Sequence, residues 1–150
     1  MSRAKIMILA GGTGGHVIPG LTIAKALEDA KCDITWIGTK GGIEEKLVPK
    51  ANIKMEYITV MGLRGKSLMN VLIAVKQLIQ SIFQSINLLM KYRPDVVIGM
   101  GGYVSGPGGI AAFLLRYPLV IHEQNSVPGT TNKFLARIAS SVLEAFPGSF

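Results

Sequence analysis

Short apolar segments alternate with helix-like segments along almost the whole chain, and this alternation most constrains its fold. The apolar runs are typical of buried strands, and polar, glycine-rich turns bound them. Strands that alternate with helices form a parallel sheet covered on both faces, so we predict an α/β fold. The predicted strands cover residues 5–10, 33–38, 55–60, 95–100, 118–124 and 140–146.

The segments between these strands have helical patterns. A chain of 150 residues, 49% of them hydrophobic, suffices for one domain with a sizeable core. We see no internal linker, repeat or low-complexity segment, so we expect one domain. The predicted helices cover residues 67–91 and, approximately, residues 18–30, 106–116 and 128–139. A further short helix is predicted within residues 41–50.

Three polar segments follow predicted strands, and two of them are glycine-rich. They are residues 11–16 after the first strand, 101–106 after the fourth and 122–129 after the fifth. The carboxyl ends of parallel strands share one edge of a sheet, where such folds bind ligands. We therefore expect these three segments to converge on one site.

The two glycine loops have the composition of anion-binding turns. Glycines let a ligand approach the backbone closely, and free N–H groups at a helix start favour an anion. We expect Pro19 and Pro107 in the first turns of the helices that follow. Two such loops indicate a diphosphate or several anionic groups. Val17 stands where a dinucleotide fingerprint needs glycine, which weakens the alternative of a nucleotide-dependent oxidoreductase.

Two ionisable side chains are candidates for acid–base chemistry at this edge. His16 follows the first loop directly, where it is either a structural residue or a general base. Glu123 belongs to a cluster at the end of the fifth strand, which either caps the next helix or serves the site. The other members of this cluster are His122, Gln124 and Asn125.

The net charge and the composition limit the classes of ligand and partner that this chain can bind. With 16 basic and 9 acidic residues the net charge is +7, which attracts nucleic acid, anionic lipid or phosphorylated substrates. We find no cluster of carboxylates, so we predict no catalytic metal. The single cysteine, Cys32, excludes an intramolecular disulfide and fits a reducing compartment as a buried thiol.

Residues 68–90 form the most apolar stretch, and its first two turns are apolar all round. Polar side chains interrupt it, so we expect no membrane-spanning helix. One stripe (72, 75, 79, 82, 86 and 90) is predicted to cover the sheet. Basic residues surround the apolar start of this helix, which is typical of a surface that docks on an anionic membrane. The alternative is that another domain or subunit covers this surface. The predicted membrane residues are Leu68, Val71, Leu72, Val75, Ile79 and Phe113, with Arg64, Lys66 and Arg116 as cations.

Several segments together resemble the N-terminal domain of the MurG family of glycosyltransferases. They are "GGTGGHVIPGL", "RGK", "PDVVIGMGGYVSGPGG", "HEQNSVPGTTNK" and "AFPG", in the family's order and spacing. The resemblance implies a Rossmann-like domain that forms the N-terminal half of a GT-B enzyme. Residues 1–150 are then expected to bind the acceptor and associate with the membrane, and the C-terminal donor-binding domain is expected to be absent.

The resemblance also implies an activity. The family transfers N-acetylglucosamine from UDP-N-acetylglucosamine to the 4-hydroxyl of lipid I, forming lipid II for peptidoglycan, with inversion and with no metal or other cofactor. It works peripherally on the cytoplasmic face of the bacterial inner membrane and binds no nucleic acid. This chain alone is expected to be inactive. The alternative is a membrane-anchored, non-catalytic subunit that recruits a separate donor-binding chain.

Site residues carry over by their motifs. The resemblance implies that His16 is the base, with Glu123 as the alternative. The residues that correspond to donor-binding positions of the family are Thr13, Gly14, Gly15 and Asn125. The glycine loops, here Gly12, Gly101 and Gly102, are implied to bind the acceptor's diphosphate. The remaining residues implied to line the cleft are Tyr103, Ser105, Glu123 and Gln124.

Overall fold

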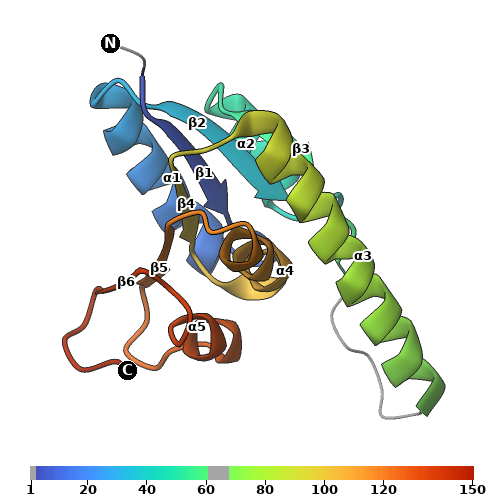
Figure 1. The fold of residues 1–150 in the computed structure, drawn as a ribbon. Coiled ribbons are helices and arrows are strands. Elements are labelled where there is room, and N and C mark those ends of the chain that lie inside the picture. Colours follow the sequence, from blue (N-terminus) through green and yellow to red (C-terminus); the bar gives the residue numbers. More distant parts are fainter. Residues whose placement is uncertain (1–2, 61–67) are drawn as a thin grey trace.

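The computed structural model describes residues 3–60 and 68–150, and these contain one parallel sheet with the strand order β3-β2-β1-β4-β5-β6 (Figure 1). The predicted α/β sheet is therefore confirmed. The order reverses between β1 and β4, which pair directly, and open α/β sheets bind ligands beyond the carboxyl ends of the strands at this point. The strands are β1 (Lys5–Leu9), β2 (Asp33–Gly38), β3 (Lys54–Tyr57), β4 (Val96–Gly99), β5 (Leu119–Glu123) and β6 (Ser141–Glu144).

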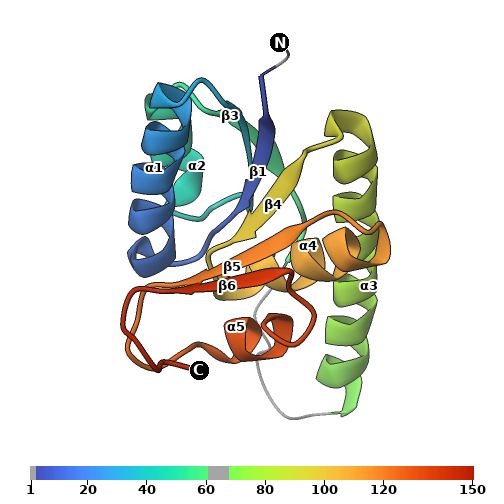
Figure 2. The same ribbon diagram turned by 60° about the vertical axis from the view of Figure 1, so that its left-hand side comes forward.

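Helices cover both faces of the sheet, as Figure 2 shows: α1 and α2 lie on one side, and α3, α4 and α5 on the other. Successive β1 side chains alternate between the two layers, so Ile6 and Ile8 belong to one buried cluster and Met7 and Leu9 to the other. The helices are α1 (Gly14–Asp29), α2 (Glu44–Lys50), α3 (Leu68–Tyr92), α4 (Gly102–Leu114) and α5 (Thr130–Leu135).

Two helices begin closer to their strands than we predicted. α1 starts at Gly14 rather than near residue 18, and α4 at Gly102 rather than near residue 106. Positive φ angles at Gly12 (90°) and Gly101 (105°) turn the chain from the strand into the helix within a few residues. Pro19 and Pro107 consequently lie inside the helices, beyond the first turn, where each removes one helical hydrogen bond.

The long helix α3 buries a different face from the one that we predicted. Ser81, Ser85 and Leu89 are fully buried, whereas all six residues of the predicted stripe are half-buried or exposed. The two serines are small enough for α4 to approach, and their hydroxyls donate to the carbonyls of Leu78 and Ser81, both at 2.8 Å. Serine thus occupies the packed face without leaving a buried hydroxyl unpaired.

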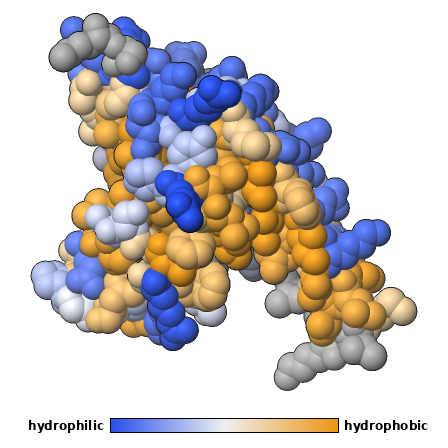
Figure 3. Space-filling view, viewed as in Figure 1, coloured by the Kyte–Doolittle hydropathy of each residue, from blue (hydrophilic) through white to orange (hydrophobic). Residues whose placement is uncertain are grey.

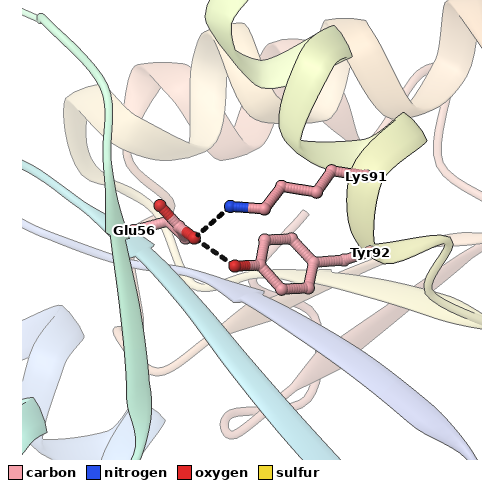
Figure 4. A network of polar contacts seen from close by, with 3 residues as sticks. All are labelled: Glu56, Lys91 and Tyr92. Carbon is pink, nitrogen blue, oxygen red and sulfur yellow. Dashed lines mark hydrogen bonds and ion pairs between the residues drawn. The ribbon is translucent and has the colours of Figure 1, made fainter.

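A polar network fastens the C-terminal end of α3 to the edge strand β3 (Figure 4). The Glu56 carboxylate accepts hydrogen bonds from the Tyr92 hydroxyl and from Lys91 Nζ, the latter at 3.0 Å. The Tyr92 hydrogen bond is the main reason why the pKa of Glu56 lies below its ordinary value, against the effect of burial. The opposite half of α3 projects past the sheet (Figures 1 and 2).

Candidate functional site

Three segments meet at the carboxyl edge of the sheet and enclose a pocket of about 290 Å³. They follow β1, β4 and β5, so the predicted convergence is confirmed. The pocket lies between β1 and β4, at the point where the strand order of the sheet reverses. Its lining residues are Gly11, Gly12, Thr13, His16, Gly101, Gly102, Tyr103, Gly129, Thr130, Thr131 and Asn132.

A buried carboxylate that the sequence analysis did not select holds the first loop in place. Glu44, fully buried at the start of α2, accepts the Gly12 N–H at 3.1 Å through Oε2. Its Oε1 accepts the N–H of Thr39 at 3.0 Å and the Thr39 hydroxyl at 2.8 Å. The Gly12 N–H is therefore engaged within the protein and is not free for a ligand.

A buried hydroxyl holds the second loop. Ser105 Oγ accepts the Gly101 N–H at 2.9 Å and lies 2.9 Å from the carbonyl oxygens of both Leu9 and Gly101, to either of which it can donate. The serine is fully buried on α4. Ser105, which was predicted to line the cleft, is not among the residues that line this pocket, and its hydroxyl is enclosed beneath the loop.

Glu123 holds the third segment. Its Oε1 accepts the backbone and side-chain N–H groups of Asn125, both at 2.9 Å, and its Oε2 accepts from Gly129 N at 3.1 Å and Asn132 Nδ2 at 2.9 Å. Burial opposes ionisation, but these hydrogen bonds outweigh it and hold the pKa of Glu123 below its ordinary value. A fully buried carboxylate with both oxygens occupied does not fit the predicted roles of base and of cleft-lining residue.

Asn132 adds an unpaired acceptor to the pocket. The residue is 1% exposed and lines the pocket, and its Nδ2 donates to Glu123 and, at 3.3 Å, to the carbonyl of His122. Its Oδ1 is buried without a hydrogen-bond partner among the described residues. Such an atom needs a donor, which a ligand hydroxyl or N–H can supply. The sequence analysis did not select Asn132, because a single polar residue within a predicted helix does not indicate a ligand-binding role.

Among the described residues, His16 and Tyr103 are the ionisable side chains that line this pocket. The His16 ring is half-buried against Gly101, where an added Cβ would lie 2.8 Å from Cε1. Nδ1 contacts Nε2 of Gln124, which also donates to the Met100 carbonyl at 2.9 Å. Gln124 therefore reaches the site through His16 and does not line the pocket itself.

The remaining predicted ligand contacts divide into two groups. Gly12, Thr13, Gly101, Gly102 and Tyr103 line the pocket. The other group lies beside it: Gly14 and Gly15 form the first turn of α1, and the exposed Asn125 has its Nδ2 bound to Glu123.

An apolar groove of about 530 Å³ adjoins the pocket between α3 and α4. Tyr103 and Thr131 line both, so the groove continues the polar site into an apolar one. Figure 3 shows apolar side chains gathered over this face. The predicted membrane residues that the structure describes are exposed, for example Leu72 at 58%, Ile79 at 50% and Phe113 at 50%, and Val71 and Val75 also line the groove; Arg116 is exposed too. Arg64, Lys66 and the Leu68 side chain lie outside what the structure describes.

By length and composition alone, the segment Met69–Tyr92 of α3 is able to cross a membrane, which differs from our prediction. Only 11% of its most apolar window is buried. Leu89, near the C-terminal end of α3, nevertheless belongs to the core cluster that also contains Ala111 and Ala112 of α4. That end of the helix is therefore an integral layer of the domain. Among the described residues no group of three or more histidines, cysteines or acidic residues is placed to hold a metal ion.

The six-stranded parallel sheet with its alternating helices is that of the N-terminal half of a GT-B glycosyltransferase. A family model described as the glycosyltransferase family 28 N-terminal domain matches residues 6–144, and the chain belongs to this family.

Relatives with known names agree with this family. The chain is 55% identical over 146 residues to the UDP-N-acetylglucosamine–N-acetylmuramyl-(pentapeptide) pyrophosphoryl-undecaprenol N-acetylglucosamine transferase of Vibrio cholerae, covering 97% of this chain and 41% of the relative. A Histophilus somni protein of the same name is 51% identical over 99% of this chain and 42% of its own length. The crystal structure of Acinetobacter baumannii MurG superposes with a TM-score of 0.87 at 42% identity, over 98% of this chain and 42% of that chain.

The chain therefore spans about 41% of the length of the curated relatives that it matches. A glycosyltransferase of Streptomyces sp. SF2575, SsfS6, superposes with a TM-score of 0.71 at 14% identity, over 98% of this chain and 51% of that chain, and shows the shared fold.

Proposed function

We propose that this chain is the acceptor-binding and membrane-associating half of an N-acetylglucosaminyltransferase that converts lipid I into lipid II. A donor-binding domain or chain would supply most of the site for UDP-N-acetylglucosamine. The identity to the Vibrio cholerae transferase supports the proposal. The observation that carries it is the polar pocket that continues into an apolar groove, because the acceptor named for the relatives joins a sugar diphosphate to a long isoprenoid chain.

In the proposed reaction the 4-hydroxyl of the acceptor sugar attacks the anomeric carbon of the donor. The new carbon–oxygen bond forms as the bond to UDP breaks, with inversion, and the hydroxyl proton passes to a general base or to solvent water. Gly101 and Gly102 lie where the acceptor's diphosphate approaches the backbone, and the start of α1, with Thr13, Gly14 and Gly15, faces the donor. His16 is the ionisable group that we place against the reacting atoms, because Glu123 lies below the pocket.

We test this function by the sedimentation of the chain with anionic vesicles that do or do not contain lipid I. A preformed pocket that adds to surface binding should tighten the apparent affinity at least about tenfold, or about 1.4 kcal/mol. Vesicles containing undecaprenyl phosphate, which lacks the sugar and one phosphate, serve as the control. Equal binding to all three vesicles would contradict an acceptor site, and sugar transfer by this chain alone would contradict the division between two halves.

We further propose that the exposed side chains of α3 and Phe113 dock the protein peripherally on the cytoplasmic face of the inner membrane. Apolar side chains enter the interface, and each nearby cation adds about 1 kcal/mol on an anionic surface. The net charge of +7 supports this orientation.

Replacing Leu72 by glutamate should weaken binding to acceptor-free anionic vesicles by about tenfold or more, because a charge replaces an inserted apolar side chain. Gln80→Glu adds the same charge at an exposed polar position of the same helix and should change the affinity much less. Vesicle sedimentation measures both. A similar loss in the two variants would show that net charge alone, and not the apolar face, determines the affinity.

A further inference from the structure

The side chain of Gln124 lies between the two histidines of the chain, and its orientation determines where each histidine carries its proton. Nε2 of Gln124 lies 2.9 Å from the Met100 carbonyl oxygen. A carbonyl oxygen only accepts hydrogen bonds, so the atom facing it must be the amide nitrogen and not the amide oxygen. The Met100 carbonyl therefore settles which end of the Gln124 amide faces which neighbour.

The same amide nitrogen contacts His16. Nε2 of Gln124 has two hydrogens, of which one goes to Met100 and the other points to Nδ1 of His16. Nδ1 must then be the acceptor nitrogen of the neutral ring, and the ring's own proton lies on Nε2. No other hydrogen bond to the His16 ring occurs among the described residues, so Nε2 is the polar atom that His16 has left for a ligand.

The other end of the amide constrains the second histidine in the opposite sense. Oε1 of Gln124 lies 3.3 Å from Nδ1 of His122. An amide oxygen only accepts, so Nδ1 of His122 must carry the proton. When both rings are neutral, one glutamine thereby holds them in opposite tautomers.

We propose that Gln124 is a positioning residue that keeps the neutral His16 protonated on Nε2, so that His16 offers a hydrogen-bond donor to an oxygen of the ligand in the pocket. A diphosphate or hydroxyl oxygen has the matching chemistry. In this form Nε2 has no lone pair to accept a proton, so His16 acts on the ligand as a donor and not as the base that the sequence suggested. The catalytic meaning rests on the proposed function, whereas the tautomer does not.

The test is nitrogen-15 NMR of the imidazole rings in this chain at alkaline pH, where the rings are neutral. We expect a pyridine-type shift for Nδ1 and a pyrrole-type shift for Nε2 of His16, and the reverse for His122. The N–H···N contact also predicts a scalar coupling between Nε2 of Gln124 and Nδ1 of His16. A pyrrole-type Nδ1 in His16, or the same tautomer in both rings, would overturn the proposal and leave the acceptor-binding experiment unaffected.

Variants separate positioning from general structure. Gln124→Glu replaces the donating nitrogen by an oxygen that only accepts, so the His16 proton should move to Nδ1. Gln124→Leu should abolish the nitrogen–nitrogen coupling while the amide spectrum stays dispersed. Gln80→Glu makes the same amide-to-carboxylate change on the exposed surface of α3 and should leave both ring patterns as in the wild type. An unchanged His16 tautomer in folded Gln124→Glu would contradict control by Gln124.

Discussion

Glu123→Ala is expected to lower the free energy of unfolding by about 3 kcal/mol. The substitution leaves four N–H groups, from Asn125, Gly129 and Asn132, without their charged acceptor. Hydrogen bonds to charged groups contribute about 1.5–3 kcal/mol each, but the exposed parts of this loop can regain water, which reduces the sum. Urea denaturation followed by circular dichroism measures the effect.

The effect should depend on pH in a defined direction. The folded-state pKa of Glu123 lies below its ordinary value of 4.5, so the ionised group adds stability that is fully present above about pH 4.5. This stability is lost as the pH falls through the lowered folded-state pKa. The difference between wild type and Glu123→Ala should therefore be constant above about pH 5 and shrink in more acidic solution. The exposed Glu28→Gln is the control, and a difference that grew on acidification would contradict the assignment.

Gly102→Ala is expected to lower the free energy of unfolding by about 2–4 kcal/mol and to open the pocket. A Cβ at this position would lie 2.6 Å from the carbonyl oxygen of Gly11, so the second loop would press on the backbone of the first. The φ angle of 77° adds strain for any residue other than glycine. Backbone atoms cannot rotate away as a side chain can, so the two loops would have to separate.

Gly129→Ala provides the matched control on the same rim. Gly129 has a φ of −65°, and a Cβ there would meet no atom within 4 Å. Thermal unfolding should therefore distinguish the two variants by several degrees. Binding to lipid I vesicles should fall in Gly102→Ala, because the two loops would separate. Equal behaviour of the two glycines would show that the contact between the loops has no energetic importance.

The sequence was sufficient to predict the sheet and the place of the site, because both depend on local patterns. Each strand is an apolar run that ends near a polar turn, and parallel strands bring those turns to one edge. His16, Gly101 and Gly102 could be selected on this basis. The first residues of the helices were harder to predict, because glycines such as Gly12 and Gly101 allow a tighter turn than the position of the proline suggested.

The groups that support the loops could not be predicted in the same way. Glu44 belongs to a charged, helix-like stretch, and nothing local shows that it reaches Gly12, which is 32 residues away. Ser105 and Glu123 were selected for their chemistry, but their burial depends on the packing of α4 and α5. The stripe on α3 was misassigned because Ser81 and Ser85 satisfy their own hydroxyls and pack like small apolar residues.

Each of the three loops is fixed by one enclosed side chain: Glu44, Ser105 or Glu123. A recognition surface braced in this way loses little conformational entropy when a ligand arrives. Association should then proceed in a single kinetic phase, without a slow rearrangement step, and backbone amides of the loops should exchange slowly with deuterium before any ligand is added.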